Sequence, residues 1–273
     1  MIFNILDVFN NTLTLMRITF NKYQGAGNDF IIIDNRNGIL DPSDSNLINR
    51  LCGRRFGIGA DGLILISDHA GADFEMKYFN ADGNTGSMCG NGGRCAAHFA
   101  IKTGIAGNKQ RFMAFDGIHQ AEVSDTVVRL RMADVEEYTI IDGNYFINTG
   151  SPHYMIFTTE IDLLDVNAEG NRFRWAPQFT PGGTNVNFVE IRDKGLYIRT
   201  FERGVEEETL ACGTGVTASA IASVLKGHFD TAPVRVKARG GDLEVDFKLE
   251  NNKVTNVWLT GPATFVYEGE IDV

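Results

Sequence analysis

The sequence predicts a mixed α/β (α+β) fold made of two similar lobes with an active-site cleft between them. Three observations support this prediction: many short strand-like runs, few helices, and a strand–turn–Cys-Gly–helix pattern that occurs twice. The chain has 273 residues, of which 43% are hydrophobic and 22% charged. That length is enough for two lobes of ordinary domain size, and that composition is typical of a globular protein.

Strands are expected wherever short β-branched or aromatic runs alternate with Gly, Asn or Asp turns. These runs cover residues 29–34, 62–67, 74–79, 126–132, 144–148, 153–157, 187–191, 196–201, 234–238, 243–247 and 255–259. A final run at 264–271 is expected to return to the first lobe.

Two helices are expected directly after the cysteine motifs, in "GRCAAHFAIKTG" and "VTASAIASVLKG". They end at Gly104 and Gly227, where a glycine is the usual C-terminal cap. Both are small and apolar nearly all round, which is typical of a helix enclosed by protein and also of an ordinary core helix.

An internal duplication explains why the two cysteine motifs look alike. Residues 77–92 align with residues 199–215, and an asparagine stands at the mouth of a strand in "GAGNDF" and in "GGTNVNF". We expect a first lobe over 1–135 that carries Cys89 and a second over 136–262 that carries Cys212. Residues 263–273 would form the returning strand, and residues 1–15 would be an appendage.

Composition excludes several function classes. The net charge of −10 and pI near 5.0 argue against nucleic-acid binding, which needs a basic surface to meet the phosphates. No apolar run is long enough for a membrane span, and the N-terminus lacks the pattern of a signal peptide. Four cysteines are too few for a disulfide scaffold, which favours the cytoplasm. We expect no metal site, because the histidines are scattered and no paired CxxC occurs.

Each Cys-Gly-polar-Gly motif places a sulfur at a helix N-terminus. Unpaired amides and the positive end of the helix dipole favour the thiolate there. The same amides form an anion site suited to a carboxylate, and the glycines let a ligand approach closely. A small buried residue before an ordinary N-cap explains one such motif about as well, but it explains two corresponding motifs poorly.

Two such sulfurs on opposite sides of one ligand would invert a stereocentre. One thiolate removes a proton from carbon, and the other thiol returns a proton to the opposite face. Two helix N-termini aimed at a carboxylate would stabilise the carbanionic transition state. We expect no cofactor, because neither a pyridoxal-lysine context nor a dinucleotide motif is evident.

The chain resembles the diaminopimelate epimerases from about Phe20 to Glu270. The resemblance rests on "FNKYQGAGNDFIIID", "GIGADGLI", "FNADGNTGSMCGNGGRC", "SPH", "TNVNFVEI", "FERGVEEETLACGTG" and "LTGPATFVYEG". It implies a cofactor-independent, two-thiol isomerase of lysine and peptidoglycan biosynthesis that converts LL-diaminopimelate to the meso form. It also implies two mostly antiparallel sheets, each wrapped around a central helix, and a homodimer.

Residue roles follow from the same resemblance. Cys89 and Cys212 are the expected catalytic pair, and His153 and Glu202 are expected to support activity. The expected substrate contacts are Asn28, Asn80, Gly90, Asn91, Asn185, Glu202, Arg203, Gly213 and Thr214. Cys52 and Cys95 are expected to be structural. Purely structural roles are also open for these residues: His153 would be a histidine in a turn, and Glu202 and Arg203 would form a surface ion pair.

Three positions depart from the family pattern: Gln24 where a histidine is usual, Gly62 where a glutamine is common, and Ser151 in place of an asparagine. They leave recognition of the distal end of the substrate open. The closest alternative is a two-cysteine proline or hydroxyproline racemase of the same fold. A phenazine-type isomerase would lack the cysteine pair, and a thiol redox or binding protein would need a close CxxC.

Overall fold

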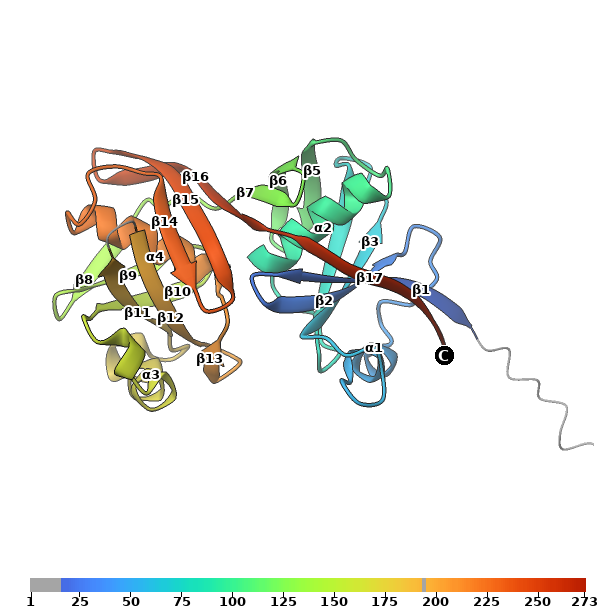
Figure 1. Ribbon diagram of the computed structural model, residues 1–273, viewed down its shortest axis with the longest axis horizontal. Coiled ribbons are helices and arrows are strands. Elements are labelled where there is room, and N and C mark those ends of the chain that lie inside the picture. The colour runs from blue at the N-terminus through green and yellow to red at the C-terminus, as the bar shows by residue number, and fades with distance from the viewer. Residues whose placement is uncertain (1–15, 193–194) are drawn as a thin grey trace, which may run out of the picture.

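The computed structural model describes residues 16–192 and 195–273, and its two lobes lie side by side (Figure 1). The expected appendage at residues 1–15 lies outside the described residues. In these ranges the strands join into one mixed sheet. The first lobe contains β1 (Arg17–Gly25), β2 (Asn28–Asp34), α1 (Ser45–Cys52), β3 (Gly62–Ser67), β4 (Phe74–Asn80), α2 (Gly90–Lys102), β5 (Lys109–Ala114), β6 (Gly117–Ser124) and β7 (Val127–Arg131).

The second lobe follows after β7, and the chain then returns to the first. Its elements are β8 (Tyr138–Ile141), β9 (Asn144–Asn148), β10 (Pro152–Phe157), η2 (Ile161–Leu163), α3 (Val166–Arg174), η3 (Pro177–Phe179), β11 (Asn185–Arg192), β12 (Gly195–Glu202), β13 (Glu207–Thr209), α4 (Gly213–Leu225), β14 (Val234–Ala238), β15 (Gly241–Glu250) and β16 (Lys253–Pro262). The last strand, β17 (Thr264–Asp272), pairs antiparallel with β1.

The two lobes repeat one pairing pattern, which confirms the predicted duplication. In the first lobe β1–β2 and β3–β4 are antiparallel, whereas β2–β3 and β4–β5 are parallel. In the second lobe β9–β10 and β11–β12 are antiparallel, whereas β10–β11 and β12–β14 are parallel. The hairpins β5–β6–β7 and β14–β15–β16 then correspond.

This correspondence corrects one detail of the sequence alignment. Asn28 begins β2, the counterpart of β10, whereas Asn185 begins β11, the counterpart of β3. The two asparagines are therefore not equivalent positions of the repeat. The cysteine motifs are equivalent, because each follows the matching strand, β4 or β12.

Each lobe encloses one helix within its sheet, as predicted. Helix α2 packs against strands of the first lobe and α4 against strands of the second. Both start three residues earlier than expected, at Gly90 and Gly213, because the glycine-rich segments adopt helical rather than loop geometry. Their ends agree with the prediction, since Gly104 and Gly227 follow the caps with φ of 72° and 81°.

The isoleucine run of β2 is buried on both faces of the sheet. Phe30 and Ile32 point toward α2, whereas Ile31 and Ile33 belong to a second core that includes residues of α1. Helix α3 occupies a similar place on the second lobe, where Val166 packs with Phe188 and Phe201. Because β2 is buried on both faces, its sequence is continuously apolar and does not alternate between apolar and polar residues.

The sheet runs from one lobe into the other through β16. Residues Glu244 to Glu250 of β15 pair with one side of β16, and Val127 to Arg131 of β7 pair with Trp258 to Pro262. The chain then continues as β17 over the first lobe, so one long ribbon crosses the molecule (Figure 1). Within the described residues, no helix has the length and apolar character needed to cross a membrane.

Several strands were not predicted, namely β1, β5, β6, β8 and the short β13, and neither were α1 and α3. Strands β5 and β6 mix charged or polar residues with apolar ones, and several residues of each strand are exposed. Their mixed composition obscured the strand pattern, and sheet pairing decided the outcome.

Deleting residues 264–273 should damage the first lobe and spare the second. The deletion would leave β1 paired only with β2 and would expose Phe20, which is 6% exposed and packs edge-on against Tyr267. Hydrogen–deuterium exchange should show faster exchange in peptides from β1 and α2, with peptides from β11 and α4 as the internal reference. Equal acceleration in both lobes would contradict this expectation.

Candidate active site

The two cysteine-bearing helices meet end to end between the lobes. Cys89 and Cys212 are the N-cap residues of α2 and α4, with nearly equal backbone angles of −105°, 117° and −109°, 111°. A β-carbon added at Gly213 would lie 3.7 Å from the Cα atom of Gly90. This approach brings two positive helix ends to one place.

A hydrogen bond across the lobe boundary fixes this meeting point. The side-chain amide of Asn91, in the first turn of α2, donates to the carbonyl oxygen of Ala211 at 2.9 Å. The fully buried guanidinium of Arg94 donates to Asn91 Oδ1 at 2.9 Å and to the carbonyl of Gly90 at 3.3 Å. No carboxylate lies within 4.0 Å of Arg94 among the described residues, so this buried cation has only neutral partners.

Cys212 stands at the end of a chain of buried polar groups. Thr200 Oγ1 donates to Asn187 Oδ1 at 2.9 Å, and Asn187 Nδ2 lies 3.0 Å from His153 Nδ1. His153 Nε2 lies 2.8 Å from Thr214 Oγ1, which lies 3.4 Å from Cys212 Sγ. Because Asn187 Nδ2 can only donate, His153 carries its proton on Nε2 and donates to Thr214.

Gly215 makes room for this chain against α4. A β-carbon there would lie 2.4 Å from Asn187 Oδ1 and 3.2 Å from His153 Cε1. Burial lowers the pKa of His153 to about 3, with a smaller contribution from Arg203, so its imidazole is neutral. A neutral imidazole fixes the Thr214 hydroxyl and leaves the hydroxyl proton free to point at the sulfur.

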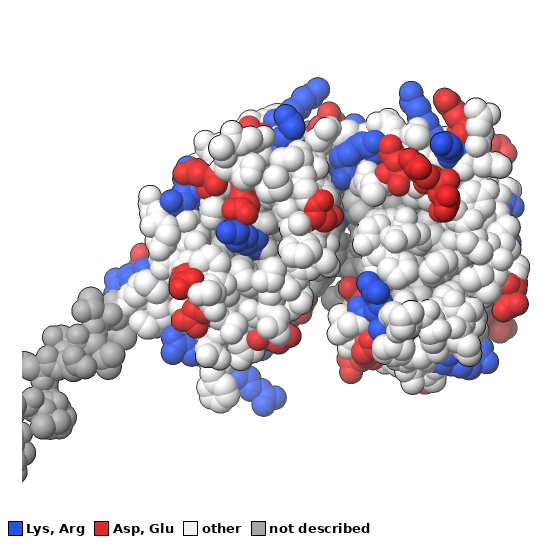
Figure 2. Space-filling view, turned by 180° about the vertical axis from the view of Figure 1, so that it is seen from behind, with Lys and Arg blue, Asp and Glu red and all other residues white. Residues whose placement is uncertain are grey.

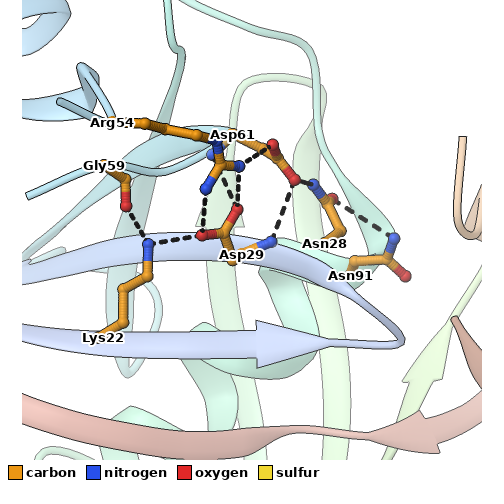
Figure 3. Close-up of polar contacts among 7 residues, drawn as sticks. All are labelled: Lys22, Asn28, Asp29, Arg54, Gly59, Asp61 and Asn91. Atoms are coloured by element: carbon orange, nitrogen blue, oxygen red, sulfur yellow. Dashed lines mark hydrogen bonds and ion pairs between the residues drawn. The ribbon is translucent and has the colours of Figure 1, made fainter. Parts of the chain in front are cut away.

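Cys89 has a different partner, Asn28 at the start of β2. Asn28 Oδ1 lies 3.7 Å from Cys89 Sγ and 3.4 Å from Asn91 Nδ2. Asn28 Nδ2 donates to Asp61 Oδ2 at 2.6 Å, and Arg54 Nη2 donates to Asp61 Oδ1, also at 2.6 Å. Figure 3 shows this line from Arg54 through Asp61 and Asn28 toward Asn91.

A second carboxylate anchors Arg54. Asp29 accepts from both terminal nitrogens of Arg54, at 2.7 and 3.1 Å, and pairs with the buried Lys22 at 2.6 Å. Lys22 also donates to the carbonyl of Gly59 (Figure 3). Burial alone would raise the pKa of Asp29, but Arg54 and Lys22 hold it at about 2. Two cations and two carboxylates therefore form a balanced network behind Asn28.

The remaining expected contacts differ in their burial and in their hydrogen-bond partners. Burial raises the pKa of Glu202, and Thr209 donates to its carboxylate at 2.9 Å. Arg203 is exposed, with no ion pair among the described residues. Asn185 is buried and bonds to Ser151 Oγ, the carbonyl of Pro152 and the amide of Arg203, each at 2.8 Å. Asn80 is exposed at the end of β4.

Burial raises the pKa of both cysteine thiols. Amides of the first helical turn oppose that rise at each sulfur, those of Asn91 and Gly92 for Cys89 and that of Gly215 for Cys212. Glu202 raises the pKa of both thiols. Cys52 and Cys95 are buried in the core, and burial raises their pKa to about 11 and about 12.

The outer surface of the described residues carries dispersed charges and a hollow. Figure 2 shows acidic and basic side chains scattered on both lobes, with a furrow between them. A hollow of about 770 Å³ is lined by Arg192, Arg235 and Lys237, away from both cysteines. Over residues 16–192 and 195–273, no group of three or more His, Cys, Asp or Glu side chains could hold a metal ion.

Sequence reasoning missed Asp61, Arg94 and Asn187. Asn187 lies two residues after Asn185 on the same strand, and period-two spacing places both on one face of the sheet. Asp61 directly precedes β3 in "GADGLI", a signal that could have drawn attention to it. Arg94 lies in "CGNGGRC", but burial of a charge without a carboxylate partner has no sequence signal.

The fold is shared with several solved structures. A phenazine biosynthesis protein of the PhzF family from Bacillus anthracis superposes with a TM-score of 0.76 at 15% sequence identity, covering 94% of this chain and 99% of its own. A hydroxyproline epimerase from Agrobacterium vitis gives a TM-score of 0.64 at 12% identity, with coverage of 94% and 93%. The chain therefore has the two-lobed fold of PhzF-type proteins and proline racemases.

Sequence relatives identify one family among the proteins that share this fold. The family described as diaminopimelate epimerase matches residues 20–135 and 145–266. A diaminopimelate epimerase of Flavobacterium psychrophilum is 48% identical, covering 92% of this chain and 98% of its own. One from Chlorobaculum tepidum is 47% identical, with coverage of 90% and 98%. The chain belongs to the diaminopimelate epimerase family, whose members are isomerases, and the predicted resemblance is confirmed.

The buried His153 should make stability depend on pH in a defined way. Its pKa falls from 6.5 to about 3 on folding, so the unfolded chain binds this proton more readily. The stability due to the neutral imidazole is complete above pH 6.5 and is lost as the pH falls toward 3, by up to about 1.4 kcal/mol per pH unit.

A variant that cannot take up this proton isolates the effect. Urea unfolding of the parent protein and of His153→Gln between pH 8 and pH 4 should show the parent losing stability relative to the variant only below about pH 6.5. A constant difference in unfolding free energy over that range would show that His153 titrates alike in both states.

Proposed function

We propose that this protein converts LL-2,6-diaminopimelate to meso-diaminopimelate without a cofactor, in lysine and peptidoglycan biosynthesis. One observation carries the proposal: two cysteines from two lobes cap two helices whose N-termini meet. Membership of the diaminopimelate epimerase family supplies the substrate.

Inversion needs a base on one face of the α-carbon and an acid on the other. A cysteine thiolate removes the α-proton, the bonding electron pair stays on the α-carbon, and the second cysteine returns a proton from the opposite side. Cysteine suits both roles because its thiol and thiolate forms are both accessible when the surroundings adjust its pKa.

The helix ends suit the carboxylate of the reacting centre. Amides of Gly90, Asn91, Gly213 and Thr214 at the two helix N-termini would hold its oxygens, and the two helix dipoles would stabilise negative charge that develops beside it. The buried Arg94 adds positive charge below the same point. Because Cys212 is buried and Cys89 is partly buried, little water would screen these charges.

Polar groups at the rim suit a substrate with amino-acid groups at both ends. Glu202 offers a carboxylate to an ammonium group, and the exposed Arg203 offers a bidentate donor to a distal carboxylate. We propose that Asn28, Asn80 and Asn185 complete this recognition, Asn185 by fixing the backbone amide of Arg203.

A proline or hydroxyproline racemase is the second candidate. It is supported by the fold shared with the hydroxyproline epimerase, a likeness at 12% identity. The compact ring of proline has no distal polar group that Arg203 or Asn80 could bind, and this favours diaminopimelate as the substrate.

The family resemblance further supports a homodimer in the cytoplasm that uses no pyridoxal phosphate. Light scattering after size-exclusion chromatography would test the dimer, since a single chain has a mass of 30.1 kDa.

Proton exchange at the α-carbon tests the reaction directly. With reduced protein in D₂O, proton NMR of LL-diaminopimelate should show loss of the α-proton signal and appearance of the meso isomer. Cys89→Ala and Cys212→Ala should each lower epimerisation by at least about a thousandfold, because each face of the carbon loses its only proton carrier. A persistent α-proton with folded, reduced protein would reject diaminopimelate, and proline would be tested next.

Replacing Arg203 separates substrate recognition from chemistry. Arg203→Met should raise the KM for diaminopimelate by about tenfold or more, because a charged hydrogen bond to the distal carboxylate is lost. Its melting temperature should stay unchanged, because the side chain is exposed. Arg50→Met, which removes an exposed arginine from α1, is the matched control. An unchanged KM for Arg203→Met would exclude this contact.

A further inference from the structure

The ring of Tyr78 lies between two glycines that leave room for it. Tyr78 is on β4, and a β-carbon at Gly62 would lie 2.5 Å from its Cε2 atom and 2.9 Å from its hydroxyl oxygen. The carbonyl oxygen of Phe79 would also lie 2.5 Å from that β-carbon. A β-carbon at Gly86 would lie 2.5 Å from Cδ1 on the other edge of the ring. Tyr78 therefore occupies the space of a side chain at position 62, where the family pattern commonly has a glutamine.

The hydroxyl end of this ring lies on the cysteine side of the sheet. The ring packs edge-on against Phe30, with 6.0 Å between the ring centroids, in the core around α2 that Cys89 also contacts. The hydroxyl lies beside Gly62, which directly follows Asp61. It therefore reaches the end of β3 at which the hydrogen bonds toward Cys89 begin.

The Tyr78 hydroxyl has no hydrogen-bond partner within residues 16–192 and 195–273. Other tyrosines show the usual case, since the Tyr23 hydroxyl lies 3.2 Å from His98 Nδ1. The Tyr154 hydroxyl likewise donates to the carbonyl oxygen of Ile141 at 3.2 Å. A phenylalanine ring would pack in the place of Tyr78 equally well. The hydroxyl is therefore not needed for packing and is available to a ligand, as donor or as acceptor.

Acidic groups from both lobes surround this hydroxyl. Burial raises the pKa of Tyr78, so the phenol is neutral, and Cys89, Asp61 and Glu202 raise it further. Glu202 is the last residue of β12, in the second lobe, so the hydroxyl faces the space between the lobes. Asp61 is paired with Arg54, whereas no cationic side chain of the described residues lies within 4.0 Å of the Glu202 carboxylate. This place therefore suits a positively charged ligand group.

We propose that the Tyr78 hydroxyl accepts a hydrogen bond from the ammonium group on the reacting carbon of the substrate, beside the carboxylate of Glu202. The proposal deepens the proposed function and rests on it, because diaminopimelate supplies the ammonium group. Tyr78 is then a substrate-binding residue in the space that Gly62 leaves open. The departure from the family pattern at Gly62 thus concerns the reacting end of the substrate and not its distal end.

A neutral oxygen suits this position better than a further carboxylate. An ammonium group has three N–H donors, and Glu202 and Tyr78 would accept two of them. Asn28 Oδ1, which lies 3.7 Å from Cys89 Sγ, would accept the third. Glu202 already raises the pKa of both cysteine thiols, and another carboxylate beside them would raise it again. The phenol adds an acceptor for the ammonium group without opposing formation of a thiolate.

Replacing Tyr78 by phenylalanine tests the contact, because only the hydroxyl is lost. With LL-diaminopimelate and reduced full-length protein, Tyr78→Phe should raise the KM by about tenfold, since the charged substrate loses a hydrogen bond. The kcat should change by less than about twofold, because the ammonium group is held alike before and during the reaction. The melting temperature should not fall, since the ring keeps its packing against Phe30. An unchanged KM would overturn the proposal.

Tyr197→Phe is the matched control. Tyr197 lies on β12, on the face of the sheet that α3 covers, and its ring lies 4.3 Å from the guanidinium of Arg192. This variant also removes one phenol oxygen from a partly buried ring, at a distance from the two sulfurs. Its KM and kcat should equal those of the parent protein. An equal rise in KM for the two variants would contradict the assignment to Tyr78.

Pimelate separates a contact to the ammonium group from a contact to a carboxylate. It has both carboxylates of the substrate and no amino group, so its inhibition constant should be the same for the parent protein and for Tyr78→Phe. An inhibition constant that rises as much as the KM would place the hydroxyl at a carboxylate and would overturn the proposal.

The two proposals fail in different ways. If the parent protein does not epimerise diaminopimelate in the NMR experiment, the proposed function is wrong. If the parent epimerises it and Tyr78→Phe keeps the parent KM, only the assignment of Tyr78 is wrong.

Discussion

The close approach of Gly90 and Gly213 is the constraint on which the rest of the structure depends. A β-carbon at Gly213 would lie 3.1 Å from Leu259 Cδ2, so a side chain at this point would crowd the leucine that packs beside both helix ends. These two helix ends carry the two sulfurs. The enclosing sheets, the Asn91–Ala211 hydrogen bond and the ribbon of β16 and β17 all hold this contact in place.

Much of the fold could be predicted from the sequence because its signals are local. The strands 62–67, 144–148 and 234–238 coincide with the observed ones, and Gly104 and Gly227 follow the two central helices as expected. Strands β1 and β5 were missed because charged and polar residues interrupt their apolar pattern, whereas pairing with neighbouring strands on both sides makes them strands. The helix starts were misplaced because "CGNGG" has a composition typical of a loop, whereas helix packing gives it helical geometry.

The residues of the candidate site were likewise predictable only in part. Cys89 and Cys212 are visible in the sequence because their motif occurs twice. Asp61, Arg94 and Asn187 are single polar residues. Asp61 is linked to Cys89 through Asn28, and Asn187 to Cys212 through His153 and Thr214, by the pairing of strands from distant segments. Arg94 lies on α2 itself, where its burial depends on the surrounding sheet. The direction of a hydrogen bond, such as the one from Asn28 to Asp61, depends on which groups can only donate or only accept in space. No linear motif carries that information.

The return of β17 to the first lobe also affects how the protein is made. In the second lobe, β8 lies beside β9 and is synthesised just before it, whereas β17 holds the matching place beside β1 and comes about 240 residues after it. The first half of the chain therefore leaves the ribosome with one edge of its sheet unpaired. That edge must stay open, without pairing with a neighbouring chain, until residues 264–272 have been translated, so the lobe that begins first is completed last.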